Sequence, residues 1–593
     1  MNEPKAASDN GQTAAIRHRD GPALIIAGPG SGKTYTLTRR LEYLINTYHK
    51  DPSEILIITF TNAAAKEMKK RACGLIGTGA EAVTIGTFHS VFFGILKNTF
   101  PINSSNIIRK EYKYIILCDI ARRLGIEEAD MSAVTDGLCT IISRRKNGMR
   151  AWSGFGSELD DKVFAMYSER LRESRLLDFD DMILKCRALF EKDHAILKKW
   201  QDRYKYIMID EFQDTNQIQY DTIHYLAGDR VNLCVVGDDD QSIYGFRGAD
   251  PGMLQSFLRD HPEAAKYELS VNYRCTAPIV CAADRVICEN KNRIEKHVSA
   301  FDQTGDNVDI RCFADRRGEV SAIKEEMLPG QPDDCCILTR TNELARVFAE
   351  ELQKAGLPVV IKGKKKSRYE TDIAKDVIAY LRLASGMYTR KDLLRVMNRP
   401  MRFISREAFD KEDAKPEDAL SYYRGRSEVY NNLVRFIEDI HSMGRSRPKA
   451  AMRYLIKVAG YERYLKSEGR PTEELYGLYE EASAYTSIRQ WLGEIEEKMS
   501  LPADKAEAVN PGNGVSVMTL HASKGLEFKE VYIVDVNEGI IPYHKAKLTE
   551  EIEEERRLFY VGMTRAIKKL HIFYIRESMG KILQPSSFLA SIR

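Results

Sequence analysis

Residues 23–34 read ALIIAGPGSGKT, and this stretch decides the fold. Its apolar half, 23–27, predicts a buried strand, and the glycines that follow predict a tight turn into the start of a helix. In such a turn successive backbone N–H groups face one anion, and the helix N-terminus adds a favourable partial charge. The strict pattern G-x-x-x-x-G-K-[ST] is missed at one position, where Ala27 replaces the first glycine. Alanine still permits a close turn, so the stretch predicts a phosphate-binding loop.

This phosphate loop (residues 27–34) supplies the candidate ligands of a nucleotide. The Lys33 ammonium is long enough to reach β- and γ-phosphates, and the Thr34 hydroxyl is a ligand for Mg²⁺. The residues expected to line the phosphates beside them are Ala27, Gly28, Gly30, Ser31 and Gly32. The alternative is a glycine-rich loop without a ligand, and a second nucleotide element in the chain argues against it.

That second element is a pair of carboxylates. Residues 206–209 (YIMI) form another apolar run, and Asp210 and Glu211 follow it directly. A carboxylate at the C-terminal end of a strand can hold Mg²⁺, directly or through water. Its neighbour can orient and deprotonate an attacking water. We therefore expect Asp210 to bind the metal and Glu211 to act as the base, the alternative being a solvated acidic pair.

Composition describes a soluble chain of several domains. A length of 593 residues is too great for one core, and 43% hydrophobic with 30% charged residues is typical of globular proteins. No apolar run is long enough to span a bilayer, and the N-terminal sequence has no apolar signal core. We expect a cytoplasmic protein without a membrane partner. The eleven cysteines lack paired C-x-x-C spacing, which argues against a metal cluster.

Charge does not point to nucleic acid by itself. The formal net charge is only +3, so nucleic-acid binding would rest on local basic surface. The clearest basic run is KGKKKSR at 362–368, a kind of run that is most often a solvated turn.

The order of the patterns predicts an α/β protein with two parallel-sheet cores, each interrupted by a mainly helical insertion. Strand-like runs alternate with helical patterns from 23 to 99 and return at 206 and 232; a second alternation begins at 335 and resumes at 515 and 531. Ligands of such sheets lie at the C-terminal ends of the strands. We expect a first core at 1–99 and 177–271 with an insertion at 100–176, and a second core at 272–372 and 505–593 with an insertion at 373–504.

Beyond these two elements, a series of motifs in a fixed order runs along the chain. They are TFTNAAAKEM (59–68), GTFHS (86–90), LDFDDMIL (177–184), IDEFQDTN (209–216), VVGDDDQSIYGFRGAD (235–250), LSVNYRCT (269–276), VMTLHASKGLEF (517–528) and EERRLFYVGMTRA (554–566). With them the chain resembles the superfamily 1 DNA helicases of the UvrD/Rep/PcrA type, from Gln12 to about Leu589. The resemblance implies two RecA-like cores that hold ATP and Mg²⁺.

The resemblance also implies roles in nucleotide binding. Gln12 is placed like the glutamine that reads the adenine edge, and its amide offers both a donor and an acceptor. Tyr273 is placed like the tyrosine that stacks on the base, the alternative being an aromatic packed between the cores. Glu527 matches a carboxylate that contacts the sugar. Arg40 matches an arginine next to the loop, although a charge on the helix surface would explain it equally well.

Three further residues are implied to act on the γ-phosphate. Gln241 resembles the residue that senses it, and Arg274 and Arg565 resemble two arginines that reach the phosphates from the second core. An arginine finger stabilises charge on the transferring phosphoryl group. Because these arginines come from the other core, we expect hydrolysis to depend on closure of the two cores.

For DNA, the resemblance implies a strand channel lined by stacking aromatics. The aromatic positions are Phe60, Phe179, Tyr244 and Phe246; the remaining predicted contacts are Asn62, Thr87, His89, His521 and Tyr543. Phe246 stands where better-known members carry Trp, Gly245 replaces a basic residue, and Tyr543 replaces a His.

These implications lead to one expected function and three alternatives. We expect an ATP-dependent helicase that moves 3′ to 5′ on single-stranded DNA and unwinds 3′-tailed duplex, with repair or replication proteins as partners. A translocase that strips proteins from DNA with little unwinding uses the same motifs, and the short second insertion keeps that alternative open. A binding module with a decayed ATPase conflicts with the intact Lys33, Asp210 and Glu211. A P-loop kinase or GTPase would not need the aromatic run at 241–248.

Overall fold

The strand that leads into the phosphate loop lies inside a parallel sheet of the first core. The structure is a computed structural model and describes residues 10–126, 131–147, 157–228, 232–245, 248–327, 334–361, 369, 371–409, 411, 414–424, 427–468, 470, 472–500, 514–578 and 580–592. The basic run 362–368 and Phe246 lie outside these residues. Two units are distinguished by their internal contacts: the chain up to Ile361 together with Gly514 onward, and the segment between them.

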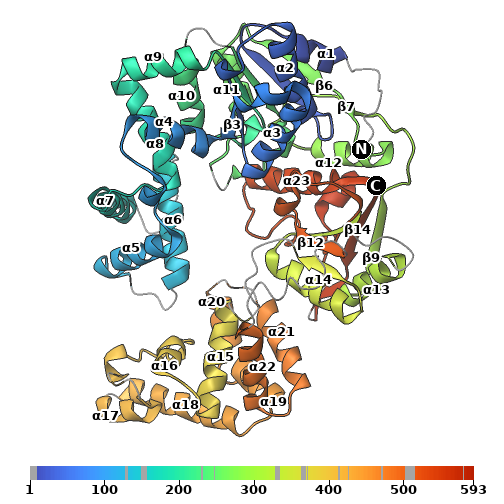
Figure 1. The fold of residues 1–593 in the computed structure, drawn as a ribbon. Coiled ribbons are helices and arrows are strands. Elements are labelled where there is room, and N and C mark those ends of the chain that lie inside the picture. Colours follow the sequence, from blue (N-terminus) through green and yellow to red (C-terminus); the bar gives the residue numbers. More distant parts are fainter. Residues whose placement is uncertain are drawn as a thin grey trace. The chain divides into compact units, whose positions relative to one another are not determined.

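Six described strands form the first sheet, in the order β3-β2-β4-β5-β1-β6 with every neighbouring pair parallel. The strands are β1 (Ala23–Ala27), β2 (Ile55–Thr59), β3 (Thr84–Thr87), β4 (Tyr206–Ile209), β5 (Leu233–Gly237) and β6 (Ala265–Leu269). The helices of this core are α1 (Asn10–Arg17), α2 (Lys33–Glu42), α3 (Asn62–Ile76), α4 (Phe88–Thr99), α8 (Phe179–Lys192), α9 (His194–Arg203), α10 (Gln217–Ala227) and α11 (Met253–Asp260) (Figure 1).

Both faces of this sheet are covered, which explains why its strands are continuously apolar. Leu24 and Leu56 belong to one hydrophobic cluster, together with residues of α4, α8 and α10. Ile25 and Ile57, the next residues along the same strands, belong to a second cluster with residues of α1, α2 and α3. Successive side chains of a strand point to opposite faces, so each strand contributes to two layers of core.

The second core repeats this arrangement with six described strands, in the order β11-β12-β10-β13-β14-β9. All neighbouring pairs are parallel. The strands are β9 (Asp309–Phe313), β10 (Cys335–Thr339), β11 (Val359–Ile361), β12 (Val515–Thr519), β13 (Phe528–Ile533) and β14 (Ala566–Ile575). The helices are α12 (Ala277–Ile287), α13 (Arg316–Met327), α14 (Asn342–Lys354) and α23 (Thr549–Met563). Short strand pairs are β7 (Val271–Asn272) with β8 (Ser299–Ala300) and β15 (Glu577–Ser578) with β16 (Lys581–Ile582). The expected class, α/β with two parallel-sheet cores, is confirmed.

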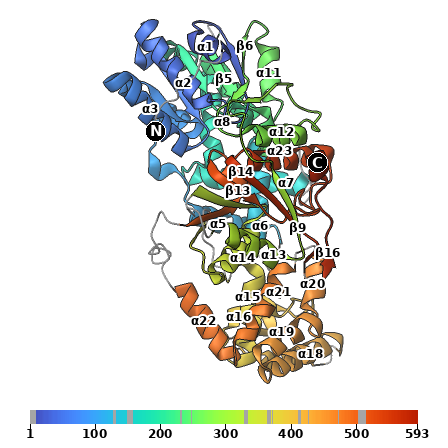
Figure 2. The same cartoon turned by 90° about the vertical axis from the view of Figure 1, so that its right-hand side faces the viewer.

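Helices dominate both expected insertions. The first holds α5 (Lys110–Arg123), α6 (Met131–Lys146) and α7 (Ser157–Glu173), which share a hydrophobic cluster of their own. The second insertion holds α15 (Asp372–Ser385), α16 (Arg390–Val396), α17 (Ala419–Tyr422), α18 (Ser427–Gly444), α19 (Pro448–Lys457), α20 (Tyr461–Ser467), α21 (Glu473–Glu481) and α22 (Ile488–Ser500) (Figure 1 and Figure 2). These helices pack around a separate hydrophobic cluster. The predicted domain boundaries stay predictions. No helix among the described residues is long and apolar enough to cross a membrane.

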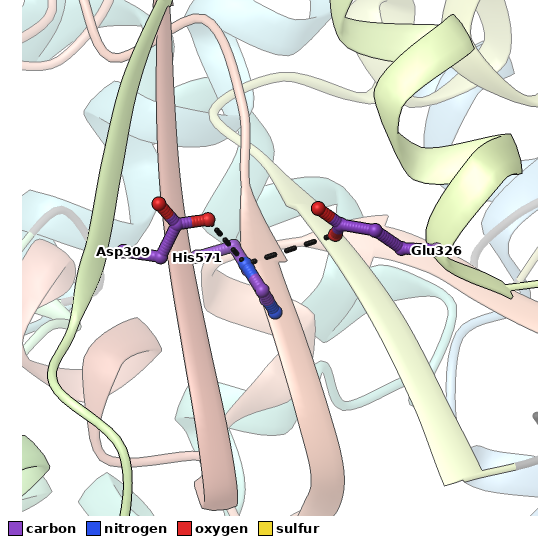
Figure 3. Close-up of side chains that lie close together, drawn as sticks. All are labelled: Asp309, Glu326 and His571. Atoms are coloured by element: carbon purple, nitrogen blue, oxygen red, sulfur yellow. Dashed lines mark hydrogen bonds and ion pairs between the residues drawn. The ribbon is translucent and has the colours of Figure 1, made fainter.

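One buried histidine joins three elements of the second core. His571 of β14 pairs through Nδ1 with Asp309 of β9 at 2.8 Å, and Glu326 of α13 lies 3.8 Å from the same nitrogen (Figure 3). Its Nε2 lies 2.9 Å from Glu530 of β13. Arg311 bonds both Asp309 and Glu326, so a guanidinium already neutralises the two carboxylates beside the ring. The cluster ties the edge strand β9 to its neighbours.

Candidate nucleotide and nucleic-acid site

The phosphate loop turns on two glycines with left-handed backbone. Gly30 has φ +64° and Gly32 has φ +83°, conformations that L side chains rarely adopt. A Cβ on Gly30 would lie 2.6 Å from the Asn272 side chain, and one on Gly28 would lie 2.8 Å from Val298. The loop is therefore closely packed against Asn272 and Val298, where only glycine fits at these two positions.

The Lys33 ammonium is buried and has no hydrogen-bond partner among the described residues. Asp238 lies 4.0 Å from it, and the Lys33 charge opposes the effect of burial on the pKa values of Asp210 and Glu211. A buried cation without a bonded partner is costly. A phosphate group would satisfy it, so the residues present fit a nucleotide at this loop.

Asp210 and Glu211 follow β4 as expected, Asp210 buried and Glu211 half-buried beside Lys33. Burial and the adjacent Glu211 raise the pKa of Asp210 to about 7. Burial also opposes the charge of Glu211, but Lys33 and Lys524 hold its pKa below the ordinary value. Glu211 has φ +54°, a strained conformation for a residue with a side chain, and Gln213 donates to its Oε2 at 2.5 Å. The carboxylate is thus ionised and fixed in orientation. Carboxylate and hydroxyl oxygens suit Mg²⁺, and a nearby cation favours the ionised form of a carboxyl group, so Asp210 and Thr34 fit that ion.

Gln241 lies in the 3₁₀ turn Asp239–Gln241, directly after β5. Its Nε2 donates to Asp238, and its Oε1 accepts from Arg565 Nη2 at 3.3 Å. Asp238 also lies 4.0 Å from Lys33. One glutamine therefore contacts a carboxylate beside the loop lysine and an arginine of the second core.

Arg565 and Arg274 both lie beside the first core's motifs. Arg565 is only 2% exposed and donates to the carbonyls of Val561 and Leu526 at 2.8 and 3.3 Å. Burial and the neighbouring Arg274 lower its pKa to about 9. Arg274 donates to Glu527 at 2.8 Å and to the Thr564 carbonyl at 3.3 Å. The two predicted arginines and Glu527 are thus brought together around the end of α23.

Lys524 is a site residue that the sequence reasoning missed. Its buried ammonium donates to Asp214 at 2.5 Å and to the Gln241 carbonyl at 2.7 Å, so it bridges two segments of the first core. Burial raises the pKa of Asp214 to about 6 despite this pairing. The available signal was its position inside the motif at 517–528.

A second missed feature is a buried ion cluster after β5. Lys296 Nζ lies 2.6, 2.6 and 2.8 Å from Asp238, Asp239 and Asp240. Arg293 adds a 2.7 Å contact to Asp240. Lys296 and Arg293 follow α12 and are far from the three acids in sequence, so no local pattern predicts these ion pairs. They neutralise three consecutive acids and hold the turn that carries Gln241.

The predicted base-contacting residues border the loop from two sides. The Gln12 amide donates to the Ser31 carbonyl at 2.8 Å. The Tyr273 backbone N–H donates to the Gly30 carbonyl at 2.9 Å. The Tyr273 ring lies 5.2 Å from that of Phe301. Their predicted contacts with a base stay predictions.

Arg40 is 1% exposed, so the alternative of a charge on the helix surface is wrong. Its guanidinium donates to the backbone carbonyls of Ala15, His18 and Arg19 at the end of α1. Arginine near a helix C-terminus satisfies carbonyls that have no partner in the helix. Arg40 thereby holds the helix that carries Gln12.

The predicted aromatics form two pairs among the described residues. Phe60 stacks on Tyr244 with centroids 5.1 Å apart and planes 18° apart, and Lys524 lies 5.1 Å from the Tyr244 ring. Phe179 is 60% exposed and meets the edge of His89 at 5.5 Å. Burial lowers the pKa of His89, which favours its neutral form. An exposed ring at the N-terminus of a helix suits stacking on a base.

The remaining predicted contacts lie at the ends of elements. Thr87 caps α4 through the Ser90 N–H, and Asn62 is the exposed first residue of α3. His521 opens a 3₁₀ turn after β12. Tyr543 lies under the Arg340 guanidinium, 4.8 Å from its ring centre. The structure gives none of them a ligand, and their roles stay predictions.

Comparison with known proteins agrees with this geometry. Residues 8–262 match the UvrD/REP helicase N-terminal domain, and residues 267–577 match the UvrD-like helicase C-terminal domain. The ATP-dependent DNA helicase PcrA of Staphylococcus aureus (strain Mu50) is 32% identical over 98% of this chain and 85% of its own length. The protein of the same name from Staphylococcus epidermidis (strain ATCC 35984) is 32% identical over 98% and 86%. The chain therefore belongs to the UvrD/REP family of helicases.

Proposed function

We propose that this protein is an ATP-dependent DNA helicase that moves 3′ to 5′ along single-stranded DNA and separates the strands of a duplex. The observation that carries the proposal is the contact of Arg565 with Gln241 at 3.3 Å. It joins an arginine at the end of α23 to the segment that also contains Tyr244. The segment after β5 thus contains Asp238, which lies beside Lys33, and Gln241, which contacts Arg565. It also contains Tyr244, which stacks on Phe60.

Each residue near the loop has a defined task in hydrolysis. ATP with Mg²⁺ supplies the phosphoanhydride and the charge that polarises it. Lys33 and the loop N–H groups bind the phosphates, while Thr34 and Asp210 hold the ion. Glu211, ionised and oriented by Gln213, takes the proton of the attacking water. Arg274 and Arg565 stabilise the charge that develops on the transferring group.

Coupling to DNA runs through the segment after β5. Gln241 and Tyr244 are three residues apart, and Lys524 contacts both, through the Gln241 carbonyl at 2.7 Å and the Tyr244 ring at 5.1 Å. A shift of the second core that tightens Arg565 against Gln241 also moves Lys524. The Phe60–Tyr244 stack would then open or close for a base. Hydrolysis of ATP would reverse this shift of the second core once per catalytic cycle.

The direction of movement and the place in repair or replication rest on the resemblance to the family. A cytoplasmic location stays a prediction. The second candidate function is a translocase that removes bound proteins with little unwinding, and it uses the same contacts. The predicted ATP and DNA residues all lie outside the segment between Ile361 and Gly514, so they do not distinguish the two candidates.

Matched substrates distinguish the candidates. A helicase of the proposed direction unwinds a duplex with a 3′ single-stranded tail at least tenfold faster than one with a 5′ tail. A translocase displaces streptavidin from a biotinylated oligonucleotide while leaving both duplexes paired. Lys33→Ala serves as the control that separates ATP-driven from passive displacement. Preference for the 5′ tail would overturn the proposed direction.

A further inference from the structure

The last turn of α6, in the first helical insertion, reaches two places in the first core. Lys146 is its final residue and Asn147 follows. Both side chains contact the N-terminus of α8, where Phe179 is the first helical residue. Asn147 also contacts a residue that follows the carboxylate pair of the ATP site. Neither residue belongs to the nucleotide or DNA contacts predicted from sequence.

Lys146 is buried between two carboxylates. Its Nζ lies 2.8 Å from Asp178 and 2.6 Å from Asp181, and only 3% of its side chain is exposed. These two acids form the capping box of α8, in which each side chain accepts from the other's backbone N–H. The Tyr167 hydroxyl completes the group with a 3.1 Å bond to Asp178. The backbone at Phe179 is therefore fixed on its N-terminal side.

Asn147 fixes the other side of Phe179. Its Nδ2 donates to Asp180 Oδ1 at 3.1 Å and to the Ser143 carbonyl at 2.7 Å. Phe179 itself stays 60% exposed. A ring that is exposed on a rigid backbone is a stacking platform whose position depends on the groups that hold it.

The same Asn147 reaches toward the ATP site. Its Oδ1 accepts from Asn216 Nδ2 at 2.9 Å. Asn216 ends the segment that begins at Glu211 and passes through the 3₁₀ turn Phe212–Asp214. Within that turn the Asp214 N–H donates to the Glu211 carbonyl at 3.0 Å, and Lys524 bonds the Asp214 side chain at 2.5 Å. Four residues thus separate Glu211 from Asn216, which contacts Asn147.

We propose that Lys146 and Asn147 are positioning residues that link the base stacked on Phe179 to the hydrolytic carboxylate Glu211. Lys146 and Asn147 hold the carboxylates on either side of Phe179, and Asn147 passes any displacement to Asn216. This route enters from the first insertion, whereas the one through Gln241 and Tyr244 enters from the second core, and Lys524 contacts both. The inference rests on the proposed function, because it requires that single-stranded DNA stimulates hydrolysis.

Two substitutions remove amide donors along the route. Asn147→Asp keeps the acceptor for Asn216 but cannot donate to Asp180 or to the Ser143 carbonyl. Asn216→Asp keeps the cap of α10, an acceptor for the Gln219 N–H at 2.9 Å, but cannot donate to Asn147. Asn98→Asp is the matched control, because Asn98 donates to the Gly94 carbonyl four residues back, as Asn147 does to Ser143, and lies at an exposed helix end.

The experiment compares ATP hydrolysis with and without oligo(dT), together with thermal unfolding. Both Asn147→Asp and Asn216→Asp should lower the stimulation by DNA about 3- to 10-fold, the range that a single hydrogen bond carries. The rate of Asn147→Asp without DNA and the midpoint of unfolding should match the wild type, and Asn98→Asp should be stimulated fully.

Three results would overturn the inference. They are full stimulation in either variant, loss of stimulation only together with a lower unfolding midpoint, and equal loss in Asn98→Asp. A wild-type protein that DNA does not stimulate would instead contradict the proposed function itself. Lys146→Arg, which keeps the charge, should retain more stimulation than Lys146→Met, as expected for a group that positions rather than reacts.

Discussion

Single side chains at the ATP site are held by charges from distant parts of the chain. Glu211 keeps a pKa below its ordinary value because Lys33 and Lys524 outweigh its burial. Lys33 was expected from the loop pattern, whereas Lys524 lies over 300 residues away and was not recognised. Sequence patterns identify residues whose spacing is local, such as Gly30, Gly32 and Asp210. They do not identify a partner that only the fold brings near.

Removing Arg565 should abolish most of the catalysis. We expect Arg565→Ala to lower the DNA-stimulated kcat about 10³-fold, because an arginine finger stabilises charge that exists only in the transition state. Arg565→Lys should fail similarly, since an ammonium cannot reach the Val561, Leu526 and Gln241 acceptors together. Steady-state hydrolysis with oligo(dT) measures both. A rate within tenfold of the wild type, for a folded variant, would remove Arg565 from the catalytic group.

At the scale of elements, the apolar central strands were predictable and several others were not. β1, β2, β4 and β5 are unbroken apolar runs, and each was expected from its sequence. The edge strand β6 (AKYEL) carries exposed Lys266 and Glu268, and the edge strand β9 (DIRCF) carries half-buried Asp309 and Arg311, so neither has the apolar pattern of a buried strand. β14 contains two lysines near its start. The positions of β6, β9 and β14 in the sheets depend on pairing with neighbouring strands, which no local sequence pattern predicts.

The histidine of β14 makes the stability of the second core depend on pH. Burial alone would lower the pKa of His571, but bonds to Glu530 and Asp309 raise it above the ordinary value. Carboxylates only accept, so both ring nitrogens carry protons. A raised pKa in the folded state stabilises the fold below the unfolded pKa of about 6.5 and stops doing so as pH rises through the folded value.

We therefore expect His571→Gln to be most destabilising near pH 6 and least destabilising near pH 9. The measurement is the midpoint of thermal unfolding of the wild type and the variant across this range. The wild-type advantage should shrink as pH rises. An advantage that stays constant or grows would show that His571 acts by packing alone.

The helical unit between Ile361 and Gly514 depends on one buried carboxylate. Asp376 is fully buried and accepts from Arg399 at 2.8 Å and from the Tyr461 hydroxyl at 2.6 Å, with Arg395 at 2.6 Å. Asp376→Ala leaves Arg399, 1% exposed, without its counter-charge, and breaking a buried pair costs about 3–5 kcal/mol.

Urea unfolding followed by limited proteolysis of this unit tests that estimate. Glu480→Ala is the matched control, because Glu480 makes an exposed pair with Lys449 at 3.4 Å and should cost at most about 1 kcal/mol. Equal stability of the two variants would mean that the other buried groups compensate for Asp376.

At the scale of the whole molecule, described residues of the second core contact segments of the first core beside the phosphate loop. Arg565 meets Gln241, Lys524 meets Asp214, and both partners lie on segments that follow strands of the first sheet. The class of the fold and the ATP residues followed from the sequence, since the motifs are local. The contacts between the cores did not, because they depend on how two sheets meet within one unit.

The most direct test is the steady-state rate of ATP hydrolysis with and without single-stranded DNA, with Lys33→Ala as the inactive reference and single-stranded RNA as a comparison. The account predicts strong stimulation of the wild type by DNA and no hydrolysis by Lys33→Ala under either condition. Hydrolysis that is equally fast without DNA would contradict the coupling of the aromatic pairs to the ATP site. Activity in Lys33→Ala would contradict the assignment of the site itself.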